Sequence, residues 1–319
     1  MPGSLTETFD NLYTTTWQNM KSETADQIFD ATPFWFWLRQ NGRLEAVAGG
    51  RFLTEPLRYA SSDNVTFVRK GSAMPLADKE FLTVAKEDWR YLADSIVRFG
   101  VDDQQNRGKN AILSLMNAKL ENSRDSLVDT LETRLAGSAG TDQFNGLQDI
   151  IADAGTGTVH GINSSTDTWW QNQDHDLTGV SFATSGVDEM LIMMNECSNN
   201  LRMDRPDFLL TGQVVYQYYW GETLAQRRVI NKTLGDMGFQ NVEFMGTPLV
   251  WAPTIGTRIY FINSRFLRFK YDPQMFFDMT EWKAIPAQIN DRVAQIVLAG
   301  NLMTSRRRTL GVIHTIDTA

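Results

Sequence analysis

Residues 49–80 read GGRFLTEPLRYASSDNVTFVRKGSAMPLADKE. Apolar and polar side chains alternate in two runs, 51–59 and 64–69, on either side of the turn-rich residues 60–63. That pattern predicts a β-hairpin with one half-apolar face. Strands of about 14 residues would reach roughly 45 Å, and so long a hairpin is unstable alone in water. Its open edges favour pairing with another chain, so we expect an arm that a neighbour covers.

A long helix is predicted over about residues 106–136, which contain no proline. Apolar side chains recur at helical spacing along one face: Ile112, Met116, Leu120, Leu127, Leu131 and Leu135. The other faces are polar, and Gly137 to Gly140 end the pattern as a C-cap and linker. About 30 residues give a rod of roughly 45 Å, far longer than the usual helix. We call this helix the spine.

Composition indicates a soluble globular protein made in a cytoplasm. The chain has 319 residues, of which 42% are apolar and 21% charged. The net charge of −8 argues against tight non-specific binding to nucleic-acid phosphates. Cys197 is the only cysteine, which excludes an intrachain disulfide and a cysteine-based zinc site. The longest apolar run, 34–38, is too short to span a membrane, and no signal peptide is recognised at the start.

Further elements alternate between helix and strand after the spine. Trp17 belongs to a polar N-terminal segment that suits either an arm or a first core helix, Thr32-Pro33 breaks any helix, and residues 34–38 must be buried. We predict helices over 184–201 and 213–234, and strands within 81–99, 208–210, 242–244, 247–251, 258–262 and 266–316. The part after the spine is therefore predicted to contain an α/β domain.

No motif predicts catalysis, a metal or a cofactor. Gly155 to Gly161 lacks the lysine of a phosphate loop and a glycine where His160 stands, so it is interpreted as a flexible surface loop. Asp174-His175-Asp176 has no second histidine nearby and is interpreted as a solvated loop. Cys197, among methionines, is expected in the core. Arg306-Arg307-Arg308 is the only basic run, either a solvated strand end or a contact with an acidic neighbour or nucleic acid.

In this order, the elements resemble the tailed-bacteriophage major capsid proteins of the Hong Kong 97 fold. The residues that carry the resemblance are Ile28 to Pro33, Gly49-Gly50, the spine with its Gly137–Gly140 end, Asn145 to Ile151, Val159 to Ile162 with Trp169-Trp170, Met245 to Val250, and Gly300 to Leu302 with Arg306-Arg307-Arg308. The resemblance implies an α+β fold with an N-arm, an extended E-loop hairpin, a P-domain with the spine, and an α/β A-domain. The implied boundaries are 1–45 for the N-arm, 46–82 for the E-loop, 83–140 for the P-domain, 141–265 for the A-domain, and 266–319 for the return to the P-domain.

The resemblance also implies a structural, non-enzymatic role in the virion capsid, assembled in the host cytoplasm. Such subunits form hexamers and pentamers that close an icosahedral shell around double-stranded DNA, with a portal and, in some relatives, a decoration protein. Contact with the packaged DNA is expected to be weak, because the chain is acidic. Candidate contacts between subunits are Trp17, Arg51, Arg58, Arg69, Lys70, Arg306, Arg307 and Arg308.

This sequence departs from the family pattern in two respects. Many relatives begin with a cleaved scaffolding segment, and there is no room for one before Trp17, so a separate scaffolding protein is implied, or a segment that this sequence does not include. The namesake phage cross-links an E-loop lysine to an asparagine of a neighbour; here Lys70 and Lys79 match by location only. An ordinary salt bridge between subunits is expected instead for Arg69 and Lys70. The alternatives are an encapsulin-type nanocompartment shell and, more remotely, a soluble α/β metal-dependent enzyme using Asp174-His175-Asp176.

Overall fold

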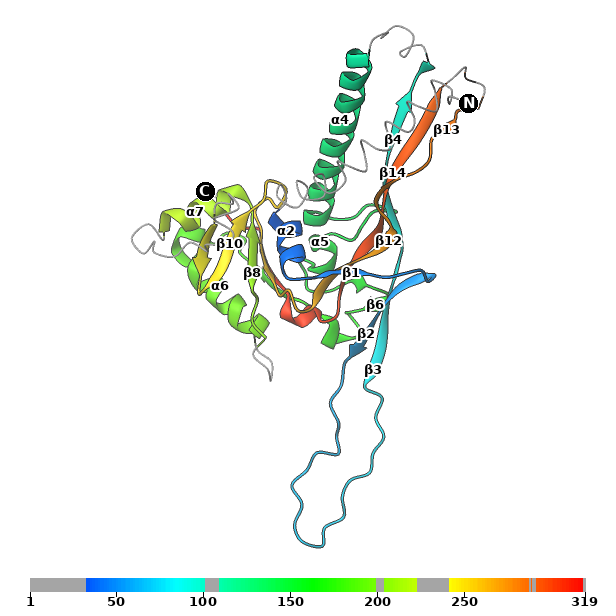
Figure 1. The fold of residues 1–319 in the computed structure, drawn as a ribbon. Helices are drawn as coiled ribbons and strands as arrows, with labels where there is room; N and C mark the ends of the chain where they lie inside the picture. Colours follow the sequence, from blue (N-terminus) through cyan, green and yellow to red (C-terminus); the bar gives the residue numbers. More distant parts are fainter. Residues whose placement is uncertain are drawn as a thin grey trace.

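The chain forms a body of two mixed sheets, with a rod at one end and a long arm at the other (Figure 1). The structure, a computed structural model, describes residues 33–100, 109–198, 204–222, 241–286, 288 and 291–317. Helices and strands are mixed throughout, so the predicted α+β class is confirmed. No helix in these ranges is long and apolar enough to cross a membrane.

The first sheet extends from the body into the rod. Its order is β1-β12-β14-β13, and β4 also pairs with β14. The strands are β1 (Leu44–Ala46), β4 (Arg90–Arg98), β12 (Leu267–Met279), β13 (Lys283–Ala284) and β14 (Arg292–Thr304). The strands predicted within 81–99 and 266–316 are confirmed. β12 and β14, at 13 residues each, reach about 43 Å, and a bulge at Phe277, with φ 51°, bends β12.

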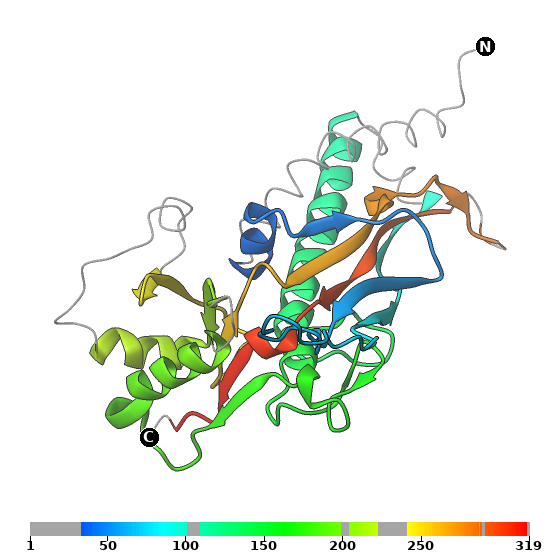
Figure 2. The same cartoon turned by 90° about the horizontal axis from the view of Figure 1, so that it is seen from below.

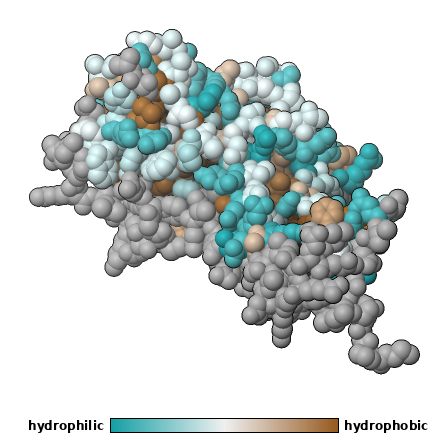
Figure 3. All heavy atoms as spheres, turned by 90° about the horizontal axis from the view of Figure 1, so that it is seen from above, coloured by the Kyte–Doolittle hydropathy of each residue, from teal (hydrophilic) through white to brown (hydrophobic). Residues whose placement is uncertain are grey.

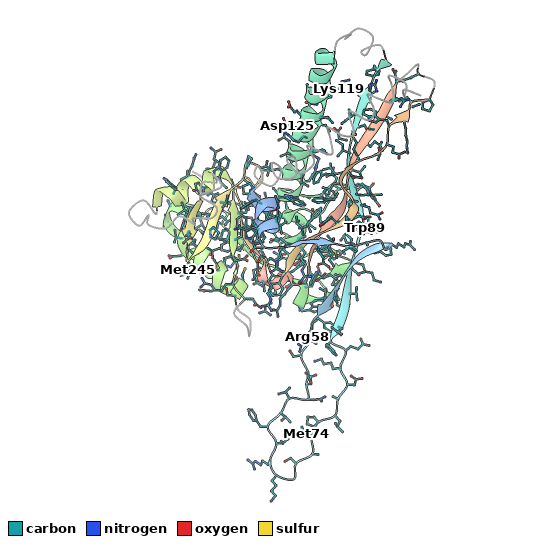
Figure 4. All side chains as sticks on the ribbon, viewed as in Figure 1. Arg58, Met74, Trp89, Lys119, Asp125 and Met245 are labelled. Atoms are coloured by element: carbon teal, nitrogen blue, oxygen red, sulfur yellow. The ribbon has the colours of Figure 1, made fainter. Side chains whose placement is uncertain are left out.

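The spine is α4 (Lys109–Ala136), 28 residues or about 42 Å long. Leu120, Leu127, Leu131 and Leu135 of the predicted stripe are buried; the side chains of Ile112 and Met116 lie outside the described residues. Polar contacts tie the spine to β4, because Lys119 Nζ donates to the Val97 carbonyl at 3.1 Å and the Ser123 hydroxyl to Asp94. Figure 4 shows Lys119 and Asp125 along the rod, and α5 (Leu147–Ile150) follows the end of the spine.

The second sheet and its helices make the lobe beside the rod (Figure 1). Its order is β7-β15-β11-β8-β10-β9. The elements are β7 (Gln173–Asp176), β8 (Phe208–Thr211), β9 (Asn241–Phe244), β10 (Thr247–Trp251), β11 (Ile259–Ile262), β15 (Gly311–His314), α6 (Phe182–Ser198) and α7 (Gln213–Glu222). The described parts of the predicted 184–201 and 213–234 helices are confirmed; 199–203 and 223–240 lie outside the described residues.

The central strands of the lobe are apolar on both sides. Leu209, Leu249 and Phe261 pack with α6 and α7, whereas Leu210 and Tyr260 belong to the main core that includes the spine. A sheet covered on both faces needs continuous apolar runs rather than alternation, which is why these strands read as short apolar segments.

The helix α2 (Pro33–Gln40) joins the two sheets. Proline suits the first position of a helix, because its missing N–H has no partner there. Trp37 stacks on Phe208 of the second sheet with ring centroids 4.9 Å apart, and Trp35 meets Phe269 of the first sheet edge-on at 4.7 Å. Burial of the 34–38 run is thereby confirmed, with Phe36 only partly buried.

Candidate assembly surfaces

The arm has a paired foot and an unpaired distal loop. β2 (Phe52–Arg58) pairs antiparallel with β3 (Leu82–Asp88), with Arg58 opposite Leu82. The prediction that residues 64–69 form the returning strand after a turn at 60–63 is therefore wrong. Burial selects the partner: alternate residues of β2, including Leu53 and Leu57, face the body, whereas residues 65–82 are all exposed and no surface orients them.

Apolar packing holds the foot against the body. Leu53, Leu57, Ala85, Trp170 and Met303 form one buried cluster around 3₁₀-helix η1 (Thr168–Trp170). Nearby, the ring of Tyr59 lies 5.4 Å from that of Trp169, and Trp89 Nε1 donates to the Gly50 carbonyl at 2.9 Å. Figure 4 shows Trp89 at the junction of body and arm. The foot therefore has a defined direction relative to the body.

A buried ion pair adds a second attachment. Lys270 Nζ on β12 lies 2.6 Å from Glu55 Oε2 and donates to the Thr54 carbonyl, also at 2.6 Å. Lys270 is 4% and Glu55 7% exposed. Arg268 Nη1 bridges Glu45 at 3.1 Å and approaches Glu55 at 3.8 Å. Two cations and two carboxylates thus connect β2 to β1 and β12.

His160 makes the third attachment, and its interpretation as part of a flexible surface loop is wrong. It lies in the hairpin of β5 (Thr158–Val159) and β6 (Ile162–Asn163) and is 2% exposed. Its Nδ1 is 2.9 Å from Glu87 Oε2, and the Thr304 N–H donates to its Nε2 at 3.2 Å. Because Nε2 accepts from Thr304, Nδ1 is the ring nitrogen that donates to Glu87. Its carbonyl accepts from the Lys86 N–H at 3.0 Å.

Glu87 is held as a carboxylate by these contacts. Burial alone raises its pKa, but the hydrogen bonds from His160 and Asn145 and the charge of Arg90 together bring it below its ordinary value. These contacts at the foot of the arm therefore stabilise the charged form of Glu87.

The distal loop is closed on itself by two pairs of contacts. Asn64 Nδ2 donates to the Ala77 carbonyl at 2.7 Å, and the Ala77 N–H donates back to Asn64 Oδ1 at 2.9 Å. Lys79 Nζ and Asp63 Oδ2 are 2.8 Å apart. Beyond this closure the loop exposes large apolar side chains: Val65, Phe67, Val68, Met74 and Leu76. Figure 4 labels Met74 in this part of the arm.

Four of the predicted contact residues lie on the arm and are exposed. Arg69 and Lys70 are in the distal loop. Arg51 stacks over the Phe52 ring at 5.0 Å, and Arg58 Nε donates to the Ala60 carbonyl at 3.3 Å. All four can reach a neighbouring chain. Trp17 lies outside the described residues.

The three arginines 306–308 have different surroundings. Arg307 lies in 3₁₀-helix η2 (Arg307–Thr309) and is fully buried, so its prediction as a contact between subunits is wrong. It donates to the carbonyls of Ile150 and Trp170, at 2.8 and 2.9 Å, and to side-chain oxygens of Ser164 and Asn172. Burial lowers its pKa to about 10. Nothing in the sequence separates it from its neighbours, since only the turn of η2 directs it inward.

Arg306 remains at the surface beside Arg265. Both bind the carboxylate of Asp204, with Arg265 Nη1 at 3.0 Å from Oδ1 and Arg306 Nη1 at 3.2 Å from Oδ2. Both also lie over the Phe266 ring, at 5.7 and 5.4 Å from its centroid. Arg308 is exposed. Sequence reasoning missed Arg265, which is about 40 residues away along the chain.

The residues considered for a metal or a thiol site do not form one. Asp174-His175-Asp176 lies on strand β7, not in a solvated loop, and its alternation separates His175 from the two aspartates. Both ring nitrogens of His175 face α6, at 3.0 Å from Glu189 and from Glu196. Within the described ranges, no three His, Cys, Asp or Glu side chains are placed to hold a metal ion. Cys197 is buried beside Met193, as predicted, and burial raises its pKa.

Away from the arm, the described residues also expose large apolar side chains on the lobe, among them Val187, Leu191 and Ile192 of α6 at 37–43%. Figure 3 views the molecule from the end opposite the arm, where the described surface is a mixture of hydrophilic and near-neutral side chains with smaller apolar patches. The arm, anchored at its foot and apolar at its far end, is therefore the clearest candidate for contact with another molecule.

The chain is similar in fold to several solved shell proteins. A chain of the Cyanophage A-1(L) capsid asymmetric unit is 14% identical with a TM-score of 0.63, and the match covers 88% of this chain and 92% of that one. A chain of the capsid of a native GTA particle is 11% identical with a TM-score of 0.56, and the match covers 88% of this chain and 90% of that one. A chain of Mycobacterium phage Adephagia is 13% identical with a TM-score of 0.52, and the match covers 86% of this chain and 89% of that one. No protein-family model and no curated protein matches the sequence.

These matches span most of both chains, so they extend well beyond one common sheet. Identity between 11% and 14% is too low to carry over any residue's role, but shared architecture at this coverage establishes the fold. The chain therefore has the Hong Kong 97 fold of tailed-phage capsid proteins.

Proposed function

We propose that this chain is the structural subunit of a tailed-phage capsid. It assembles with copies of itself, through hexamers and pentamers, into an icosahedral shell around double-stranded DNA. The role is structural rather than catalytic. The division proposed is an N-arm to residue 45, an E-loop over 46–82, a P-domain over 83–140 and from 266 onward, and an A-domain over 141–265.

The observation that carries the proposal is the arm. Its foot is fixed by the Leu53 cluster, the Glu55–Lys270 pair and the Glu87–His160 bond, while its distal loop exposes five large apolar side chains. A monomer gains nothing from ordering such a loop, because exposed apolar groups favour burial against a partner. A copy of the same chain is the partner that a closed symmetric shell provides.

The test is to remove the distal loop and leave the foot intact. Residues 61–79 are replaced by Asn-Gly, which connects Ala60 to Glu80 by a two-residue turn and extends the Arg58–Leu82 register. A deletion that began at Thr54 would also remove the buried Glu55 and so confuse folding with assembly. The shortened chain should keep the unfolding midpoint of the full chain but form no closed particles in negative-stain microscopy, alone or with a scaffolding protein.

A matched variant keeps the loop and changes only its surface. Phe67→Ser with Leu76→Ser removes two nearly fully exposed apolar groups and should reduce particle yield without changing stability. Normal particles from the shortened chain would contradict the proposal, as would a full-length chain that stays monomeric under all these conditions.

An encapsulin-type nanocompartment shell is the second candidate, because such shells share the fold. The Synechococcus elongatus PCC 7942 encapsulin gives a TM-score of 0.48, which decides nothing between the two. A neighbouring terminase and portal gene would support the phage capsid, and a peroxidase or ferritin-like cargo gene would support the nanocompartment. For the phage capsid, we also propose a separate scaffolding protein, a portal and, optionally, a decoration protein as partners.

A further inference from the structure

Two exposed arginines, Arg265 and Arg306, are paired at the surface of the body. Arg265 and Arg306 share the carboxylate of Asp204, whose side chain is only 9% exposed, while the arginine side chains are 55% and 44% exposed. Each guanidinium contacts the carboxylate through Nη1. Both cations also lie over the same Phe266 ring. The pair is thus held in place before any ligand arrives.

Two further arginines flank this pair in the sequence and are exposed. Arg205 adjoins Asp204, and Arg308 lies two residues after Arg306. Asp207, three residues after Asp204, is also exposed, and its carboxylate accepts from the backbone N–H and the hydroxyl of Ser264. The four arginines outnumber these two carboxylates, which gives a local excess of positive charge on a chain whose net charge is −8.

We propose that this surface, the Arg265–Arg306 clamp, binds phosphates of the nucleic-acid backbone. Guanidinium forks match phosphate oxygens in a bidentate geometry that lysine cannot reproduce, and all four cations are arginines. The inference rests on the proposed function, because an enclosed double-stranded DNA supplies the phosphates. The inference adds where the chain contacts the DNA and which side chains make the contact. The net negative charge of the chain keeps that contact weak.

The clamp lies on the same side of the body as the arm. η2, which Arg306 precedes, packs against η1, and the Trp169 ring of η1 meets Tyr59 at the foot. Figure 2 views the molecule from below and shows η2 near the arm seen end-on. A ligand at the clamp is therefore close to the foot of the arm but separate from its distal loop.

The experiment measures binding of a fluorescent 20-base-pair DNA duplex to unassembled subunits between 25 and 200 mM salt. Each phosphate contact adds about 0.9 to the slope of log K against log salt. Losing two contacts in Arg265→Gln with Arg306→Gln should lower the slope by about 1.8, which corresponds to roughly sixtyfold weaker binding at 0.1 M salt. Arg69→Gln with Lys70→Gln removes the same charge from the arm and should leave the slope unchanged.

Two variants keep the test valid if loss of the Asp204 partners disturbs folding. Arg308→Gln leaves the shared carboxylate paired and should lower the slope by about 0.9. Arg265→Lys with Arg306→Lys keeps the charge, so the slope should persist while affinity falls severalfold with loss of the fork.

Equal loss in the clamp and arm variants would overturn the proposal, as would a wild-type subunit without measurable binding at 25 mM salt. Particles from the Arg265→Gln, Arg306→Gln variant are counted by negative-stain microscopy in parallel. Particle loss with unchanged DNA binding would assign the clamp to an acidic neighbouring subunit instead. Failure of the wild-type chain to form particles would contradict the proposed function. Whether the clamp binds phosphates would still be decided by the binding measurement with the DNA duplex.

Discussion

Replacing Lys270 by methionine should weaken the fold at the foot of the arm more than any surface charge change. Methionine has a similar length and is apolar, so the substitution removes the charge and leaves the volume of the site nearly unchanged. Glu55 then keeps only Arg268, whose Nη1 is 3.8 Å away, in place of an ammonium at 2.6 Å. The Thr54 carbonyl loses its donor as well.

The expected magnitude follows from which group is left unpaired. Breaking a buried pair by removing one partner costs about 3–5 kcal/mol. Lys270→Met should cost about 3 kcal/mol, at the lower end of that range, because Arg268 still partly compensates the charge of Glu55. Glu55→Gln should cost less, about 1–2 kcal/mol, because Lys270 keeps the Thr54 carbonyl and has Glu45 at 3.9 Å. Glu55→Leu combined with Lys270→Met should cost less than Lys270→Met alone, since no buried carboxylate is left without its partner.

Urea unfolding followed by tryptophan fluorescence measures these free energies, and particle yield by negative-stain microscopy reports the arm's position. Lys270→Met should be the most destabilised of these variants. It should also give a lower particle yield under conditions where its subunit is fully folded. The reasoning on the buried pair would be refuted if Lys270→Met and Glu55→Gln cost the same within about 0.5 kcal/mol. It would also be refuted if the Glu55→Leu, Lys270→Met double variant cost as much as Lys270→Met alone or more.

Three further predictions concern the body. The pKa of Glu87 is lower in the folded chain than its ordinary value of 4.5, so its contribution to stability is present above that value and is lost as the pH falls through the folded pKa; Glu87→Gln should flatten this part of the stability–pH curve measured in urea, and an unchanged slope would contradict it. Gly212→Ala should prevent stable folding, because a Cβ there would lie 1.6 Å from the Gly256 carbonyl oxygen; a normal thermal midpoint would show that this close approach is not required. Cys197 should react with a thiol reagent at pH 8 only after unfolding in urea, because it is 1% exposed and burial raises its pKa; rapid reaction of the folded subunit would rule out this core position.

Local patterns predicted the elements whose burial depends on near neighbours in the sequence. The spine was predicted over about 106–136, and its described part, Lys109–Ala136, is helical throughout, because the leucine stripe and the absence of proline act over single turns. The lobe strands β8, β10 and β11 were recognised as short apolar runs. The anchors of the arm were not predicted, because each joins residues far apart: Glu55 with Lys270, and Glu87 with His160.

The sequence by itself indicated a protruding arm between residues 49 and 80, a spine with one apolar face and a mixed α/β lobe. Periodicity and turn residues specify such features because they act between residues a few positions apart. Only the tertiary structure decided that β2 pairs with β3 rather than with residues 64–69, that Arg307 is buried while Arg306 is exposed, and that His160 supports the arm. These outcomes depend on which distant surface covers a side chain, and the free energy of that burial is set by the assembled fold and not by the local pattern.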